Sequence, residues 1–277
     1  MKISVLISVY RSEKPEYFDR ALQSIWDDQV RKPDEIVLVQ DGPLGEELQA
    51  VIKNWKSKLG DVLVLIINDE NIGLTKSLNK GIKVAKGEYI ARMDSDDISL
   101  PERFMLQESF LDANPLVYVL GGAIQEFNDE DGIIAERHYP DNTEAILKYI
   151  YKASPVAHPA VMIRKALFDE GVVYNENYRT TQDLALWLDV LKTKHQIANL
   201  HEFVLKFRRN SGVYQRRKNK KDSQMELKIH LKGIKSLFGF SPIKSMYPIA
   251  RYCLRLLPNS IIEVIYNSRI RGKLLSK

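Results

Sequence analysis

Strand-like and helix-like hydrophobic patterns alternate along the first hundred residues. Apolar residues follow one another almost without interruption in short runs, which is typical of strands that are covered on both faces. Between these runs, apolar residues recur at helical spacing, as in Tyr17, Phe18, Ala21, Leu22 and Ile25. The pattern predicts strands at 3–9, 35–39, 62–67 and 89–93, and helices at 16–26, 44–59 and 75–85.

Repeated strand–helix–strand units predict an α/β fold with a mostly parallel central sheet and helices on both faces. Ligands of such sheets bind beyond the carboxyl ends of the strands. Polar groups lie at three of these strand ends, namely Ser8 to Tyr10, Asp41 and an acidic run that begins at Asp94. We expect these groups to meet at one edge of the sheet and to share one site.

The regularity falls after Pro101. Helical patterns remain at 102–111, 144–151 and 184–191, and apolar strands are expected at 117–120 and at a segment that ends at Ile163. From about Gln215 the chain becomes basic and helical, and Pro242, Pro248 and Pro258 interrupt it.

Composition narrows the class of protein. A chain of 277 residues that is 44% hydrophobic can form one large α/β domain with an appendage, or two small domains. The formal net charge of +5 fits anionic partners such as nucleotides, nucleic acid or an acidic lipid surface, without choosing among them.

The single cysteine, Cys253, excludes an intramolecular disulfide and favours a reducing cytoplasmic location. The N-terminus reads as a strand and not a signal peptide, and no apolar run approaches the ~18 residues of a membrane span.

The acidic run Asp94, Ser95, Asp96, Asp97 carries the strongest chemical signal. Carboxylates that converge in a cleft repel one another unless they are protonated or neutralised. Mg²⁺ or Mn²⁺ neutralises such a group through oxygen ligands, and substrate phosphates complete the coordination. The alternative is a helix cap or an exposed turn, where Asp is also common.

Two further aspartates have a functional and a structural interpretation. Asp41, in Gln40-Asp41-Gly42-Pro43, either accepts a hydrogen bond from a nucleobase or forms a turn. Asp183, before the expected helix at 184–191, is either a general base that accepts a hydroxyl proton or an N-cap.

A functional and a structural interpretation also exist for His158 and for the pair Arg216 and Arg217. His158 lies beside an apolar strand and is either an active-site residue or a structural histidine. The two arginines suit a diphosphate through their bidentate geometry, or belong to a solvated basic run.

Missing motifs exclude several classes of enzyme. The chain has no G-x-G-x-x-G after the first strand and no G-x-x-x-x-G-K-[ST], which argues against dinucleotide oxidoreductases and P-loop NTPases. It also lacks G-x-S-x-G and H-E-x-x-H, so a serine hydrolase of that type and a zinc protease lose support.

Taken in order, these segments resemble the inverting family 2 glycosyltransferases, which have the GT-A fold and, in bacteria, build O-antigen, capsule and exopolysaccharide. The resemblance covers roughly residues 1–215. It rests on the opening strand up to Tyr10, on Asp41-Gly42, on Asn71-Ile72-Gly73 with Asn79, and above all on the stretch from Gly87 to Asp97, close to G-x-Y-I-A-x-L-D-x-D-D. Arg11 stands where the family often has Asn, and Gln182 precedes Asp183 where the family has Glu.

The resemblance implies a role for each matching residue. Asp96 would be the main ligand of Mn²⁺ or Mg²⁺ and Asp183 the catalytic base, while Asp97, His158 and Gln182 would lie near the acceptor and the donor sugar. The remaining residues would bind the nucleotide, usually UDP: Ser8, Val9, Tyr10, Asp41, Arg92, Asp94, Ser95, Arg216 and Arg217. Residues 1–97 would be the nucleotide-binding half and 98–215 the acceptor half of a catalytic domain at 1–215, followed by a basic helical region at 216–277.

The implied reaction is one in-line displacement that moves a hexose or N-acetylhexosamine from a UDP-sugar to a hydroxyl of a glycan or lipid-linked glycan, with inversion to a β-linkage. Polyprenyl-diphosphate-linked acceptors would suit a peripheral protein on the inner face of the cytoplasmic membrane. The basic helical region either lies on such a membrane or packs against protein. Two other classes stay open: an Mg²⁺-dependent phosphoryl-transfer enzyme, and a non-enzymatic basic module.

Overall fold

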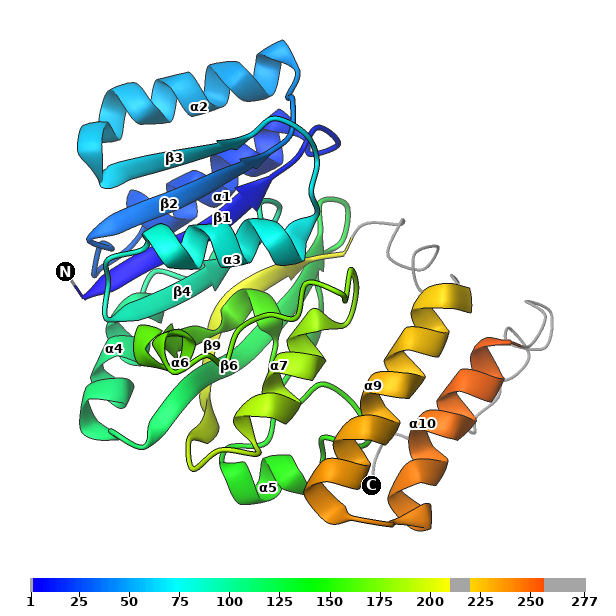
Figure 1. The fold of residues 1–277 in the computed structure, drawn as a ribbon. Coiled ribbons are helices and arrows are strands. Elements are labelled where there is room, and N and C mark those ends of the chain that lie inside the picture. Colours follow the sequence, from blue (N-terminus) through cyan, green and yellow to red (C-terminus); the bar gives the residue numbers. More distant parts are fainter. Residues whose placement is uncertain (1, 210–219, 257–277) are drawn as a thin grey trace. The chain divides into compact units, whose positions relative to one another are not determined.

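The computed structural model describes residues 2–209 and 220–256 (Figure 1). Contacts divide the chain into two compact units, Met1–Asn210 and Ser211–Lys277. Among the described helices, none is both long enough and apolar enough to cross a membrane.

One sheet organises the first unit. Strands β1 (Ile3–Val9), β2 (Glu35–Asp41), β3 (Leu63–Asn68) and β4 (Tyr89–Met93) pair in parallel in the order β3-β2-β1-β4. Beyond β4 the sheet continues through β8 (Met162–Arg164), β6 (Val117–Asn128), β9 (Gln196–Arg208) and β5 (Ile98–Ser99), with β7 (Gly132–Arg137) paired to β6. The sheet is therefore parallel in its first half and mixed in its second.

Helices cover both faces of the parallel half (Figure 1). Helices α1 (Pro15–Trp26) and α2 (Glu46–Leu59) bury their apolar residues in one core with the odd-numbered residues of β1. Helix α3 (Leu74–Val84) covers the opposite face, where Gly81 lies against Leu6 and Val39. A Cβ at position 81 would meet Leu6 Cδ1 at 2.2 Å, so glycine allows this close approach of helix and sheet.

Short helices connect the strands of the second half. Helix α4 (Arg103–Ala113) precedes β6. The others follow along the chain in the order α5 (Thr143–Leu147), η2 (His158–Ala160), α6 (Lys165–Asp169) and α7 (Gln182–Val190). In the second unit, α9 (Lys220–Phe238) and α10 (Pro242–Arg255) pack side by side as a helical hairpin (Figure 1).

The α/β class is confirmed, and the expected strands and helices of the first hundred residues lie within two residues of the observed ones. The second half departs from expectation. The strand expected at 117–120 continues to Asn128, and β9 was not expected at all. Strand β6 continues through Gly121 and Gly122. Glycine is needed at these positions because side chains of Asn199 and Val204 occupy the space that Cβ atoms there would need. The helix expected at 144–151 ends at Leu147.

Candidate active site

The carboxyl ends of β1, β2 and β4 meet at one edge of the sheet. In the parallel register Val9 pairs with Gln40, and Ile7 pairs with Met93. The segments that follow these strands therefore leave the sheet side by side. This places Tyr10, Asp41 and Asp94 at the same edge, as the sequence pattern predicts.

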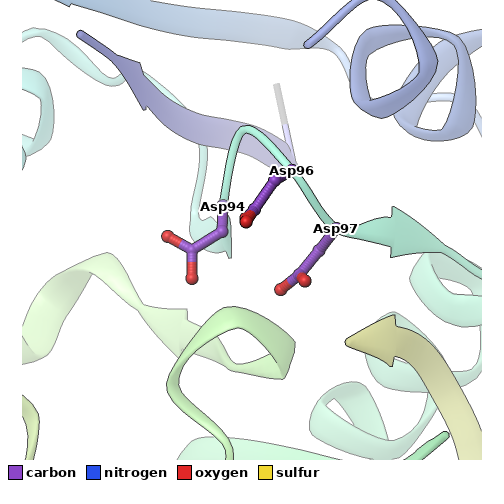
Figure 2. A group of neighbouring side chains, drawn as sticks. All are labelled: Asp94, Asp96 and Asp97. Carbon is purple, nitrogen blue, oxygen red and sulfur yellow. The ribbon is translucent and has the colours of Figure 1, made fainter. Parts of the chain in front are cut away.

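Three carboxylates gather in the turn between β4 and β5. Figure 2 shows Asp94, Asp96 and Asp97 directed to the same side of this turn, and one carboxylate oxygen from each lies within 4.8 Å of the others. Asp94 and Asp96 are half-buried and Asp97 is buried. The segment leads into a strand and not a helix, so the alternative of a helix cap is wrong, and its burial excludes an exposed turn.

Burial and mutual repulsion make this cluster unfavourable when it is fully ionised. Burial, followed by the charges of Asp94 and Glu13, raises the pKa of Asp96 to about 7. Burial and its two acidic neighbours also raise the pKa of Asp97 well above the ordinary value. Asp97 Oδ2 is buried and has no hydrogen-bond partner in the described part of the chain. Clustered oxygen ligands with unmet negative charge fit a hard divalent cation.

Arg208, at the end of β9, holds the turn that carries the three carboxylates. Its backbone N–H donates to Asp97 Oδ1 at 2.8 Å, and its Nε donates to the Asp96 carbonyl at 2.8 Å. The guanidinium lies over the rings of Tyr17 and Phe127 and forms an ion pair with Asp129. Arg208 therefore fixes the turn through its bonds to Asp96 and Asp97. It lies 111 residues after Asp97, and no sequence pattern connects the two.

Glu13 adds a fourth carboxylate to this region. Ser95 Oγ donates to Glu13 Oε2 at 2.5 Å, and the charge of Glu13 contributes to the raised pKa of Asp96. Glu13 lies in the loop between β1 and α1, directly after the strand end that the sequence singled out. Its position in this loop was the only available signal.

Arg92 is a buried cation beside the acidic turn. It lies in β4 and forms an ion pair with Asp94. Burial opposes its charge, but Asp94, together with Tyr174 and Asp97, raises the pKa of Arg92 overall. Its Nε and Nη1 are buried and find no hydrogen-bond partner among the described residues. These donors are suited to an anion that enters the site.

Asp41 uses its carboxylate to hold the loop after β3. Its Oδ1 accepts hydrogen bonds from Asn68 Nδ2 at 3.1 Å and from Ile72 N at 2.9 Å, and its Oδ2 accepts one from Gly73 N at 3.0 Å. Gly42 follows with φ of 90°, a conformation that favours glycine. Asp41 therefore has a structural role as the last residue of β2, and its contact with a nucleobase stays a prediction.

Asp183 is the second residue of α7, because the helix begins at Gln182, earlier than the sequence pattern predicts. The N-cap position belongs to Thr181, so the N-cap interpretation of Asp183 is wrong. Thr181 has φ of 62°, and no other non-glycine residue of the described chain has a positive φ. Such backbone strain concentrates at functional sites. Gln182 is buried, and its Oε1 has no hydrogen-bond partner within the described ranges.

Tyr174, which the sequence did not single out, links these groups. Its phenol is buried, and burial raises its pKa; Arg92 lowers it, whereas Asp183 and Asp94 raise it further. The charges of Asp94, Arg92 and Asp183 therefore all affect the pKa of this one buried side chain.

His158 pairs with the same phenol, since its Nε2 lies 2.7 Å from the Tyr174 hydroxyl oxygen. Burial, followed by the charge of Arg92, keeps the pKa of His158 well below its ordinary value. The imidazole is therefore neutral, and its edge also meets the ring of Trp187. His158 therefore has a structural partner in Tyr174, and its active-site role stays a prediction.

The remaining predicted residues divide into three groups. Val9 is buried in the core, whereas Ser8 is half-buried and Tyr10 is exposed at the end of β1. Ser95 is a buried residue of the acidic turn itself. Arg216 and Arg217 lie outside the described residues.

Comparison with known proteins adds a family. The model of the family described as "Glycosyl transferase family 2" matches residues 4–172. The amylovoran biosynthesis glycosyltransferase AmsE of Erwinia amylovora is 34% identical over 97% of this chain and 99% of its own length. A UDP-Gal:alpha-D-GlcNAc-diphosphoundecaprenol beta-1,3-galactosyltransferase of Escherichia coli is 30% identical over 98% of this chain and 97% of its own.

Solved structures agree on the fold. TarS (residues 1–349) of S. aureus, in complex with UDP-GlcNAc, superposes with a TM-score of 0.67 at 20% identity and covers 92% of this chain and 72% of that one. The mannosyltransferase PcManGT of Pyrobaculum calidifontis, with GDP-Man and Mn²⁺, gives a TM-score of 0.64 at 15% identity, over 92% and 70%. At these identities the likeness shows the shared fold alone.

Proposed function

The chain belongs to glycosyl transferase family 2, and on this premise we propose that it transfers a hexose or N-acetylhexosamine from a UDP-sugar to a hydroxyl of a lipid-linked glycan, with inversion. Family membership decides against the phosphoryl-transfer and non-enzymatic alternatives. The names of two relatives support the acceptor class: one takes part in amylovoran biosynthesis, and the other acts on a sugar linked to diphosphoundecaprenol. The product would be part of a bacterial surface polysaccharide.

One observation supports the proposal most directly: three carboxylates gather in the turn after β4, beside the buried Arg92 that pairs with Asp94. A transferase of this kind needs a group that holds the departing diphosphate and a base that activates the acceptor, close to one another. The acidic turn with Arg92 offers the first, and Asp183 offers the second. These residues come from β4 and α7, which lie far apart in the sequence.

The acidic turn fits a divalent cation, because Asp97 Oδ2 lacks a partner in the described chain and the pKa of Asp96 is raised to about 7. Asp96 would be the main ligand, with Asp94 and Asp97 beside it. Mn²⁺ or Mg²⁺, when bound, would stabilise negative charge on the leaving nucleoside diphosphate.

The chain's own residues would carry out the remaining tasks. Asp183 would accept the proton of the acceptor hydroxyl as that oxygen attacks the anomeric carbon, and the bond to the diphosphate would break on the opposite side. One displacement inverts this carbon, so an α-linked donor gives a β-linked product. The free N–H groups of Arg92 would donate to the diphosphate.

The other residues would bind substrate. Ser8, Val9, Tyr10, Asp41 and Ser95 would bind the nucleoside, and Asp97, His158 and Gln182 would lie near the donor sugar and the acceptor. Arg216 and Arg217 stay predictions as diphosphate ligands. We further propose residues 1–215 as the catalytic domain, with 1–97 binding the nucleotide and 98–215 the acceptor.

A panel of UDP-sugars tests the proposal with the purified full chain. We expect one UDP-sugar to be hydrolysed slowly to UDP, and EDTA to abolish this hydrolysis until Mn²⁺ or Mg²⁺ is restored. With an acceptor, Asp183→Asn should lower kcat by about 10²- to 10⁴-fold, as expected for loss of a general base. Asp189→Asn is the matched control, because Asp189 lies in the same helix and pairs with Lys192. UDP release that is unaffected by chelation, or full turnover by Asp183→Asn, contradicts the proposal.

A further inference from the structure

The seam between α9 and α10 is held by charged side chains. Glu226 of α9 accepts hydrogen bonds from Arg251 at 2.8 Å and from Arg255 at 2.5 Å. Gln224 donates to the Tyr252 hydroxyl at 3.3 Å, close to the same seam. A water-exposed helical pair usually places its apolar residues in the seam and its charges outside. In this hairpin three charged side chains, Glu226, Arg251 and Arg255, lie in the seam.

Apolar side chains of α10 are correspondingly exposed. Ile243, Met246, Tyr247 and Leu254 follow the spacing of a single helical stripe, and their exposed fractions are 81%, 66%, 40% and 48%. Phe240, in the turn before α10, is 97% exposed. The residues of α10 that bond to α9, namely Arg251, Tyr252 and Arg255, lie on another side of the helix. Contiguous exposed apolar surface of this kind marks an interaction site. We refer to these five apolar residues as the α10 stripe.

The charge of the hairpin indicates what covers the α10 stripe. Residues 220–256 contain eight Lys and Arg against two acidic residues, Asp222 and Glu226, which gives a net charge of +6. Lys228, Lys232 and Lys235 of α9 are exposed. Apolar side chains on a strongly basic helical unit are the pattern of a surface that lies on an anionic lipid bilayer. A second copy of this chain would bring another +6 to the same surface, which disfavours self-association.

We propose that the α10 stripe inserts into the interfacial layer of an anionic membrane and holds the chain at its surface. No described helix could span the bilayer, so α10 would lie in the plane of the interface. The inference deepens the proposed function and rests on it in one respect: a lipid-linked acceptor is reached at a membrane surface. Binding to lipid can nevertheless be measured without any substrate.

Co-sedimentation of the purified full chain with lipid vesicles tests the proposal. We expect binding to vesicles of phosphatidylglycerol and phosphatidylcholine, and at least tenfold weaker binding to pure phosphatidylcholine or in 1 M salt. The double substitution Ile243→Ser with Met246→Ser should weaken binding to the anionic vesicles at least tenfold. The matched control is Ile133→Ser with Ile134→Ser, because these residues of β7 are also exposed and apolar but lie in the other unit.

Three outcomes overturn the proposal: no binding of the wild-type chain to anionic vesicles, equal binding of both double variants, or a dimer in light scattering that only the α10 variant dissociates. The last result would assign the α10 stripe to a second copy. Hydrolysis of the UDP-sugar in vesicle-free buffer should be unchanged in both double variants. If the wild-type chain hydrolyses the UDP-sugar but does not bind vesicles, only the membrane proposal fails. If it binds vesicles but hydrolyses no UDP-sugar, only the proposed function fails.

Discussion

The side-chain amide of Asn79 donates a hydrogen bond of 2.9 Å to the backbone carbonyl of Tyr174, 95 residues later in the chain. The same amide reaches Glu176 Oε1 at 3.0 Å, and Thr75 Oγ1 donates to the Tyr178 carbonyl at 2.6 Å. Helix α3 therefore holds the segment that leads through the left-handed Thr181 to Asp183. A helix of the proposed nucleotide-binding half thus positions the proposed base.

Replacing Asn79 by Ala should disturb catalysis more than nucleotide binding. The buried Tyr174 carbonyl loses a donor, which costs about 1–3 kcal/mol of stability, and the segment before Asp183 loses its anchor. We expect kcat for transfer to fall at least tenfold while KM for the UDP-sugar changes less than threefold. Asn142→Ala is the control, since this N-cap of α5 costs about 1 kcal/mol without contact to the site. An equal fall of kcat in both variants would show that Asn79 contributes to stability and does not position Asp183.

Replacing Arg208 by Lys should weaken metal binding. Lysine keeps the charge but cannot reproduce the planar fork that bonds the Asp96 carbonyl, pairs with Asp129 and lies on Tyr17. The backbone N–H that Asp97 accepts is unaffected by the change. We expect the Mn²⁺ concentration for half-maximal UDP-sugar hydrolysis to rise several-fold, with a smaller change in kcat at saturating Mn²⁺. Arg209→Lys is the control, because Arg209 pairs with Glu126. An unchanged metal requirement in Arg208→Lys would rule out this supporting role.

The first half of the fold was predictable because its signals are local. Strand β4 is a compact buried run, and Asp94, Asp96 and Asp97 follow it within four residues, so that motif and site coincide. Strand β9 gave no such signal, because charged and polar residues such as His201, Glu202 and Lys206 interrupt its apolar residues. Its place is fixed by pairing with β6, about 80 residues earlier, and long-range pairing leaves little trace in one sequence.

The same reason limits prediction of the site. Asp94 and Asp183 could be proposed from their positions beside expected elements. Tyr174, Glu13 and Arg208 could not, because each acts through a partner that only the folded chain supplies. Asp41 shows the converse: its motif was visible, but its bonds to Ile72 and Gly73 were not.

Replacing Asp96 by Asn should stabilise the metal-free protein at high pH. The folded-state pKa of about 7 lies above the ordinary value of 3.8, so this group stabilises the fold below about pH 4 and loses that contribution as the pH rises through 7. In EDTA, the melting temperature of the wild type should therefore fall between pH 5 and pH 8, and Asp96→Asn should remove part of this fall.

Mn²⁺ supplies the complementary measurement. It should raise the wild-type melting temperature at pH 8 but leave that of Asp96→Asn unchanged, because a ligand stabilises only a fold that binds it. Asp169→Asn, which alters an exposed pair with Lys165, should behave as wild type in both measurements. A wild-type melting temperature that is independent of Mn²⁺ would count against the metal site.

Acid should open the α9–α10 hairpin before it affects the central sheet. Burial opposes ionisation of Glu226, but Arg255 and Arg251 outweigh it and lower its pKa below the ordinary 4.5, so its stabilising contribution is lost as the pH falls through this region. Burial, followed by Arg251, lowers the pKa of His230 to about 4 from 6.5, so protonation of this ring also favours the open form as the pH falls. Both groups therefore act in the same direction, His230 as the pH falls from 6.5 to about 4 and Glu226 as the pH falls through 4.5. Hydrogen exchange, corrected for intrinsic rates, should show protection of α9 and α10 falling about tenfold or more over this range, since one pKa unit corresponds to a factor of ten.

Glu226→Gln should already lower protection at pH 7 and reduce its dependence on pH, whereas Glu144→Gln, which alters an exposed pair with Lys148, should do neither. Equal protection of the hairpin at both pH values would show that the Glu226 ion pairs do not hold its two helices together.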